Sequence, residues 1–149
     1  MKCKLFCETA EKRGIMGSRL TEIVVDSSDP AALAAFWTAA LGYHVVRAEN
    51  GQIEIAAWEH EPANLAEQVR QGAIPPAIVF VTVPERKVGK NRLHLDLSPV
   101  DRSHQAEVER LIGLGARHAD VGQGEIRWSV LADPEGNEFC VLRSLAAGS

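Results

Sequence analysis

The sequence predicts an α+β protein made of two consecutive β-α-β-β-β modules that are related by pseudo-twofold symmetry. Shifting the chain against itself by 72 residues places His94 on Glu22 and Asp101 on Asp29, in two runs of similar pattern. In each copy an aspartate precedes a helical run that ends in Leu-Gly, with 12 residues from aspartate to leucine in the first copy and 13 in the second. An internal repeat of this kind indicates one doubled module.

The first helix has the clearest local signals. Asp29 is the expected N-cap and Pro30 the first helical residue, since an aspartate side chain can accept from a free backbone N–H and proline has none to lose. Gly42 marks the end of the helix. The apolar side chains recur at helical spacing and predict one buried stripe, formed by Leu33, Phe36, Trp37, Ala40 and Leu41.

The other elements of the first module, residues 20–83, follow from β-branched runs and turn residues. Asn50-Gly51 favours a tight hairpin, because both residues tolerate positive φ. The predicted elements are strands at 20–26, 43–48, 52–59 and 77–83, with a short helix at 64–71 as an excursion.

A basic linker at 84–92 leads to the second module at 93–144. Its helix is expected to direct Val108, Leu111 and Ile112 inward, and Glu107, Glu109 and Arg110 toward solvent. Its predicted elements are strands at 93–97, 117–121, 125–132 and 138–143, a helix at 102–114, and a turn at 133–137. Outside the modules, residues 1–19 are expected to form a disordered or loosely attached arm and residues 145–149 a frayed end.

Composition narrows the function classes. The 149 residues are 46% hydrophobic and 24% charged, as in an ordinary single globular domain. A net charge of −4 argues against nucleic-acid binding, which needs a concentrated positive field. The longest apolar run is about eight residues, against roughly 20 for a membrane span. Three cysteines without a framework fit a reducing, cytoplasmic setting. A small molecule is the expected partner.

Three segments carry a family resemblance: Asp-Pro-x-x-Leu-x-x-Phe-Trp-x-x-x-Leu-Gly-Tyr at 29–43, Gly-Lys-Asn-Arg-Leu-His-Leu-Asp-Leu at 89–97, and Asp-Pro-Glu-Gly-Asn-Glu-Phe-Cys at 133–140. Together they resemble the glyoxalase-like branch of the vicinal oxygen chelate superfamily, which includes glyoxalase I, extradiol dioxygenases and bleomycin-resistance proteins. The resemblance covers residues 20–144. It implies that each module curls its sheet into half of a half-open barrel, with a central cleft between the two halves.

The resemblance also implies metal-ligand positions on the first and last strands of each module. Carried over by motif, these are Glu22, His94, Cys140 and, in the first module, Val81. Glu22 and His94 suit Zn, Fe, Mn or Ni, but Val81 has no donor and Cys140 brings a soft thiolate into a hard site. Glu138 lies on the same strand face as Cys140 and is the alternative donor. A divalent metal is therefore not favoured.

The candidate ligand-binding residues are Glu22, Trp58, Arg92, His94, Asp96 and Trp128. Arg92 shares the strand parity of His94 and Asp96. Trp58 and Trp128 lie on strands that would wall the cleft, where an indole can stack on a planar ligand or only pack. His94 has the alternative of a structural wall residue, and Cys140 that of a small buried side chain.

Three functions remain open. The first is a small-molecule-binding protein that holds a hydrophobic or aromatic ligand in the inter-module cleft, without a complete metal site. The second is a metal-dependent lyase, isomerase or dioxygenase acting on a vicinal-oxygen substrate, with Glu22 or Glu138 as the catalytic candidates. The third is an interaction module with a residual cleft. A homodimer is expected by analogy with related folds.

Overall fold

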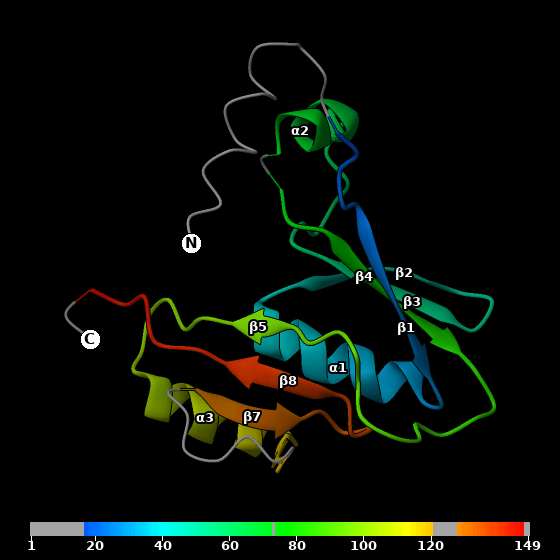
Figure 1. The fold of residues 1–149 in the computed structure, drawn as a ribbon. Helices are drawn as coiled ribbons and strands as arrows, with labels where there is room; N and C mark the ends of the chain where they lie inside the picture. Colours follow the sequence, from blue (N-terminus) through cyan, green and yellow to red (C-terminus); the bar gives the residue numbers. More distant parts are fainter. Residues whose placement is uncertain (1–16, 73, 121–127, 148–149) are drawn as a thin grey trace.

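The computed structural model describes residues 17–72, 74–120 and 128–147, and in them each predicted module forms a four-stranded sheet (Figure 1). The first sheet has the order β1-β4-β3-β2 and the second β5-β8-β7-β6. In both, the first and last strands of the module pair in parallel and the others antiparallel. The predicted α+β architecture of two β-α-β-β-β modules is confirmed. The strands are β1 (Glu22–Ser27), β2 (His44–Glu49), β3 (Gln52–Ala56), β4 (Ala77–Thr82), β5 (Asp96–Leu97), β6 (Arg117–His118), β7 (Ser129–Ala132) and β8 (Glu138–Val141).

Helix α1 (Pro30–Leu41) lies between the two sheets (Figure 1). It begins as predicted, because the Asp29 side chain accepts from the N–H of Ala32 at 3.1 Å. It ends at Gly42, whose φ of 69° is left-handed. Its buried residues Phe36 and Trp37 meet Phe139 of β8, with ring centroids 6.0 and 5.1 Å apart. Because α1 is apolar toward both sheets, the two modules share one core.

The shared core joins α1, the second-module helix α3 (His104–Gly113) and one face of each sheet. In the first sheet, Ile23 pairs with Ile78 and Val25 with Phe80, so these four side chains lie on the face toward α1. Alternation places Glu22, Val24 and Asp26 of β1 on the opposite face. The fully buried residues of the core are Leu33, Ile55, Phe80, Leu111, Leu131, Phe139 and Val141.

Two further first-module predictions agree with the structure. Asn50 and Gly51 have φ values of 50° and 74°, which is the tight hairpin expected between β2 and β3. The predicted excursion contains helix α2 (Leu65–Gln71). At the end of the predicted N-terminal arm, Arg19 donates to the carbonyl of Arg70 at 2.8 Å. The arm is thus tied to α2 at this residue, while its residues 1–16 lie outside the described part.

The second sheet is shorter than its sequence pattern predicts. Only Asp96 and Leu97 form β5, although Leu95 still accepts from the N–H of Cys140 at 2.9 Å. The chain from 91 to 95 is irregular, and at its start the N–H of Asn91 donates to Glu138. Part of the predicted strands at 117–121 and 125–132 lies outside the described residues. At the C-terminus, Leu145 donates to the carbonyl of Pro99 at 2.7 Å, so the chain is still bound at the first residue of the predicted frayed end.

The prediction for the solvent face of the second helix is wrong at Glu107 and Arg110. Glu107 is only 7% exposed and pairs with Arg110 at 2.7 Å. Arg110 in turn donates to the carbonyls of Ala39 and Ala40, at the C-terminal end of α1, at 2.9 Å each. The helical spacing of this segment could not predict these contacts of Arg110, because the carbonyls that accept from it belong to α1. The N-cap is Ser103, two residues after Asp101, and Ile112 is 39% exposed instead of buried.

No helix within the described residues is long and apolar enough to cross a membrane.

Candidate ligand-binding cleft

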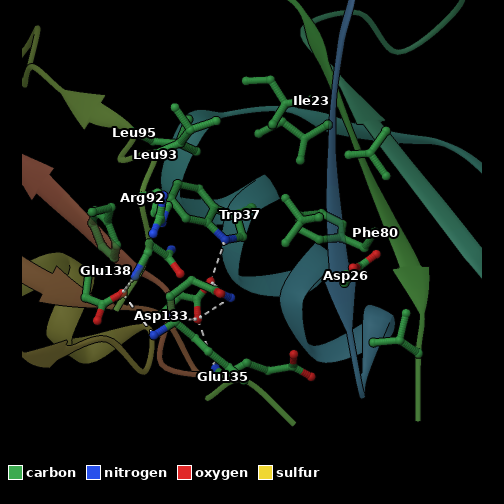
Figure 2. A pocket seen from close by; sticks show the side chains of 18 of the residues that line it. Ile23, Asp26, Trp37, Phe80, Arg92, Leu93, Leu95, Asp133, Glu135 and Glu138 are labelled. Atoms are coloured by element: carbon green, nitrogen blue, oxygen red, sulfur yellow. Dashed lines mark hydrogen bonds and ion pairs between the residues drawn. The ribbon is translucent and has the colours of Figure 1, made fainter. Parts of the chain in front are cut away.

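A cavity of about 790 Å³ opens between the two modules (Figure 2). Its apolar lining is built mainly from the core-facing side of the first sheet, from α1 and from β8. The linker and the residues leading into β5 close the other side, where Leu93 and Leu95 line it. The six side chains of the floor are Ile23, Val25, Trp37, Ile78, Phe80 and Phe139. The floor can hold a planar apolar molecule, since aromatic faces and branched aliphatic groups meet in it.

The position of Trp37 in this floor is fixed by Asp133. The Trp37 indole N–H donates to the Asp133 carboxylate at 3.2 Å, and Asp133 is fully buried. The same carboxylate accepts from the backbone N–H groups of Glu135 and Asn137, at 3.0 and 2.9 Å, and from the Asn137 side chain. A buried carboxylate with this many donors is fully satisfied. Asp133 therefore joins the turn before β8 to helix α1.

Glu135 makes the second connection between the modules. Its carboxylate accepts from the hydroxyls of Ser27 and Ser28, at 3.1 and 2.9 Å, and from the backbone N–H groups of Ser28 and Asp29, at 3.2 and 2.6 Å. These donors surround the N-terminus of α1, where a negative charge is favourable. Although Glu135 lines the cavity, its carboxylate is engaged by protein donors.

Glu138, a catalytic candidate from sequence, holds the linker against β8. Its carboxylate accepts from the N–H of Asn91 at 3.0 Å and pairs with the Lys87 ammonium at 3.0 Å. Burial opposes its ionisation, but the hydrogen bond from Asn91 and the Lys87 charge outweigh burial and keep the pKa of Glu138 below its ordinary value. Glu138 is therefore ionised at neutral pH and cannot donate a proton there.

We expect the stability contribution of Glu138 to depend on pH. Its folded pKa lies below the unfolded value of about 4.3, so the contribution is complete above that pH and disappears as the pH falls through the folded pKa. Glu138→Gln should lower the free energy of unfolding by about 1–3 kcal/mol at pH 7. Urea denaturation at pH 7 and near pH 3 should show this deficit shrinking in acid.

The matched control is Glu49→Gln, because Glu49 is exposed and its contact with Arg47 is 3.8 Å long. It should change the free energy of unfolding by less than about 0.5 kcal/mol at either pH. A Glu138→Gln deficit that stays constant between the two pH values would contradict the ionised role of Glu138.

Arg92 lines the cavity, and no hydrogen bond or ion pair of its side chain is found among the described residues. Figure 2 shows it on the side of the cavity where Glu138 lies. The parity argument that grouped it with His94 and Asp96 fails, because residue 92 precedes β5 and lies in irregular backbone. The cavity is lined by Arg92, Leu93 and Leu95 and by neither His94 nor Asp96.

The structure places the remaining candidates elsewhere. His94 is exposed, and its Nε2 lies 3.1 Å from the carbonyl oxygen of Asn91. Asp96 is adjacent to Cys140 in the register of β5 and β8. Trp128 is 42% exposed and lines neither cavity described in this section. The candidates therefore do not form one cluster.

Glu22 and Trp58 come together in a second cavity of about 430 Å³. This cavity lies beside α2, and Glu54 and Glu61 also line it. The carboxylate of Glu54 forms an ion pair with the guanidinium of Arg47, at an N–O distance of 2.8 Å. Glu22 projects from the β1 face opposite to Ile23 and Val25, which explains why it is absent from the inter-module cleft.

The donors expected for a metal do not fit one ion. Across residues 17–72, 74–120 and 128–147, no three His, Cys, Asp or Glu side chains are grouped so that they could hold a metal. Burial and a hydrogen bond to Asp96 raise the pKa of the Cys140 thiol to about 11. The register corrects the expected fourth position. Since Asp96 pairs with Cys140 and Val24 with Val79, the equivalent of Cys140 is Val79 rather than Val81.

Sequence reasoning did not assign Asp133 and Glu135 to the cleft, and it treated Trp37 as a core residue only. Trp37 is 4% exposed and both packs in the core and lines the cavity. The available signal was the Asp-Pro-Glu-Gly-Asn turn, in which Asp133 accepts from the N–H groups of Glu135 and Asn137. Nothing local in the sequence shows that the turn also accepts from Trp37 of α1 and from the residues just before α1.

Two paired β-α-β-β-β modules around a cleft define the vicinal oxygen chelate class of folds. Residues 22–142 match the family described as glyoxalase-like domain, and the chain belongs to that family. No curated protein sequence matches the chain significantly.

Solved structures agree in fold. An enzyme of the glyoxalase/bleomycin resistance protein/dioxygenase family from Burkholderia phytofirmans is 16% identical, with a TM-score of 0.59 over 83% of this chain and 97% of its own. Protein ATC0852 from Agrobacterium tumefaciens is 14% identical, with a TM-score of 0.58 over 87% and 98%. The fosfomycin resistance protein FosX from Mesorhizobium loti is 14% identical, with a TM-score of 0.52 over 86% and 91%.

Proposed function

We propose that this glyoxalase-like protein binds a hydrophobic or aromatic small molecule in the inter-module cleft, without a complete metal site. The observation that carries the proposal is the apolar floor of the 790 Å³ cavity, in which Trp37, Phe80 and Phe139 contribute aromatic surface. A cavity of this volume is in the range of small-molecule sites, roughly 300–1,000 Å³. The floor is also held in place by the hydrogen bonds of Asp133.

The scattered metal donors support a binding role over the metal-dependent alternative. Glu22 lies in the second cavity, and Glu138 is held by Lys87 and Asn91. Glu22 remains a candidate ligand-binding residue, with Trp58, in the second cavity.

The test uses Trp37 as a reporter. The sequence has three tryptophans, and Trp58→Phe with Trp128→Phe leaves Trp37 alone in the cleft. We expect the uncharged fluorophore phenylnaphthylamine to bind this protein at about one equivalent and to quench Trp37 by energy transfer. Binding should weaken when Ile23→Phe and Leu95→Phe together fill the cavity, because both side chains line it.

The matched control is Val45→Phe with Val100→Phe. Both valines are exposed, at 52% and 73%, and neither lines the cavity. The control pair should bind the fluorophore as the parent does. The proposal fails if the fluorophore does not bind, or if the filled and control variants bind it equally.

The expected homodimer remains a prediction. Within the described strands, β1 and β5 each have one neighbour in their sheet and so present a free edge. Exposed Leu20 and Val24, at 68% and 61%, lie before and on β1. Such an edge is a suitable surface for a second copy of the chain.

A further inference from the structure

We propose that the ligand of the cleft is an anion, with one carboxylate or sulfonate on an apolar body, and that Arg92 binds its acidic group. This inference rests on the proposed function, because it names the chemical class of the molecule in the same cleft. It follows from which charged groups lining the cavity are already bound by the protein and which are not.

Four of the eight charged side chains that line the cavity have protein partners among the described residues. Asp133 and Glu135 are satisfied by the donors at α1 and in the turn before β8. Glu138 and Lys87 pair with each other at 3.0 Å, and the Lys87 ammonium also donates to the carbonyl of Gly89 at 2.6 Å. A ligand that displaced any of these contacts would leave a charge unpaired, which is costly.

Four charged residues of the lining have no such contact among the residues that the structure describes: Asp26, Glu85, Arg86 and Arg92. Asp26 pairs in register with Val81, on the face of β1 away from the apolar floor. Glu85 and Arg86 are consecutive and of opposite sign, so together they add no net charge to the lining; both are exposed, as Arg92 is. Arg92 instead lies in the segment before β5, on the side of the cavity that Leu93 and Leu95 also line (Figure 2).

The charge and the planar shape of the Arg92 guanidinium favour an anionic ligand. A guanidinium presents a planar fork of donors that matches a carboxylate or sulfonate, and it stays charged at every physiological pH. Because Arg92 and the apolar floor line the same cavity, one molecule can place an aromatic body on the floor and an acidic group at Arg92. An uncharged ligand would use the floor alone and would gain nothing from Arg92.

The test compares two fluorophores that differ by one acidic group, anilinonaphthalene sulfonate and its uncharged parent phenylnaphthylamine. We expect Arg92→Met to weaken sulfonate binding about fivefold, since methionine keeps the apolar stem and removes the charge. Binding of phenylnaphthylamine should stay within about twofold, as expected for a contact that is not charge-dependent. Arg92→Lys, which keeps the charge but not the fork, should give an intermediate loss for the sulfonate.

Lys90→Met is the matched control. Lys90 is an exposed cation of the same linker and does not line the cavity, so its loss changes the net charge equally. It should leave both affinities unchanged. If Lys90→Met weakens the sulfonate as much as Arg92→Met, or if Arg92→Met affects both fluorophores alike, the role of Arg92 is disproved while the proposed function stands. If neither fluorophore binds the parent protein, the proposed function itself fails.

Discussion

Asp133→Ala should lower the free energy of unfolding by about 3–5 kcal/mol, because the substitution removes the acceptor of several buried donors at once. The Trp37 indole N–H and the N–H groups of Glu135 and Asn137 would lose their partner inside the protein. Urea denaturation followed by circular dichroism measures the change. Asp133→Asn should lose less, since one amide oxygen can still accept.

Asp101→Ala is the control for this prediction. Asp101 is exposed and its carboxylate pairs with its neighbour Arg102, so its removal should have little effect on the unfolding midpoint. An Asp133→Ala protein with the stability of the Asp101→Ala protein would show that Asp133 does not hold the turn to α1. Loss of fluorophore binding should accompany the instability, since Trp37 would no longer be fixed in the floor.

Phe139→Ala is the second large effect, with an expected loss of about 3–5 kcal/mol from the cavity left in the core. Phe139 is 1% exposed and touches both Phe36 and Trp37, so it belongs to the contact between the modules. Because the core is shared, both sheets should unfold in one transition in the parent and in the variant. Calorimetry that compares calorimetric with van't Hoff enthalpy tests this.

Leu145→Ala serves as the comparison, since Leu145 is 61% exposed, and its effect should stay within about 0.5 kcal/mol. Two separate transitions in the parent protein would contradict a core common to both modules. A small effect of Phe139→Ala would show that the aromatic contact adds little to the packing of α1.

Sequence patterns predicted the fold well because its signals are local or repeated. Asp29 caps α1, Asn50-Gly51 forms the hairpin, and the repeat produces two sheets with the same strand order. The failures concern residues whose environment is set by distant segments. Glu107 is buried and pairs with Arg110, which donates to the end of α1, and the helical periodicity of the segment does not contain that contact.

The candidate site was predicted less well for the same reason. The alternation of side chains predicts which residues share a face only within a strand. Arg92 lies before β5 begins. Consecutive side chains of a strand point to opposite faces of the sheet, so Glu22 lines one cavity and Ile23 lines the other. Arg92 lines the cleft, but the strand-parity argument that selected it does not apply to it.

The contacts at the two ends of α1 have a consequence for how the chain folds. Glu135 at the start of the helix is 106–108 residues away from its partners in sequence, and Arg110 at the other end is 70–71 residues away. Contacts at such separation form only after long loops close, which slows folding. During synthesis, the first module is complete before either residue has been made. Until residue 139 has been made, the side of α1 that packs on Phe139 remains uncovered, and this apolar surface favours aggregation of the nascent chain.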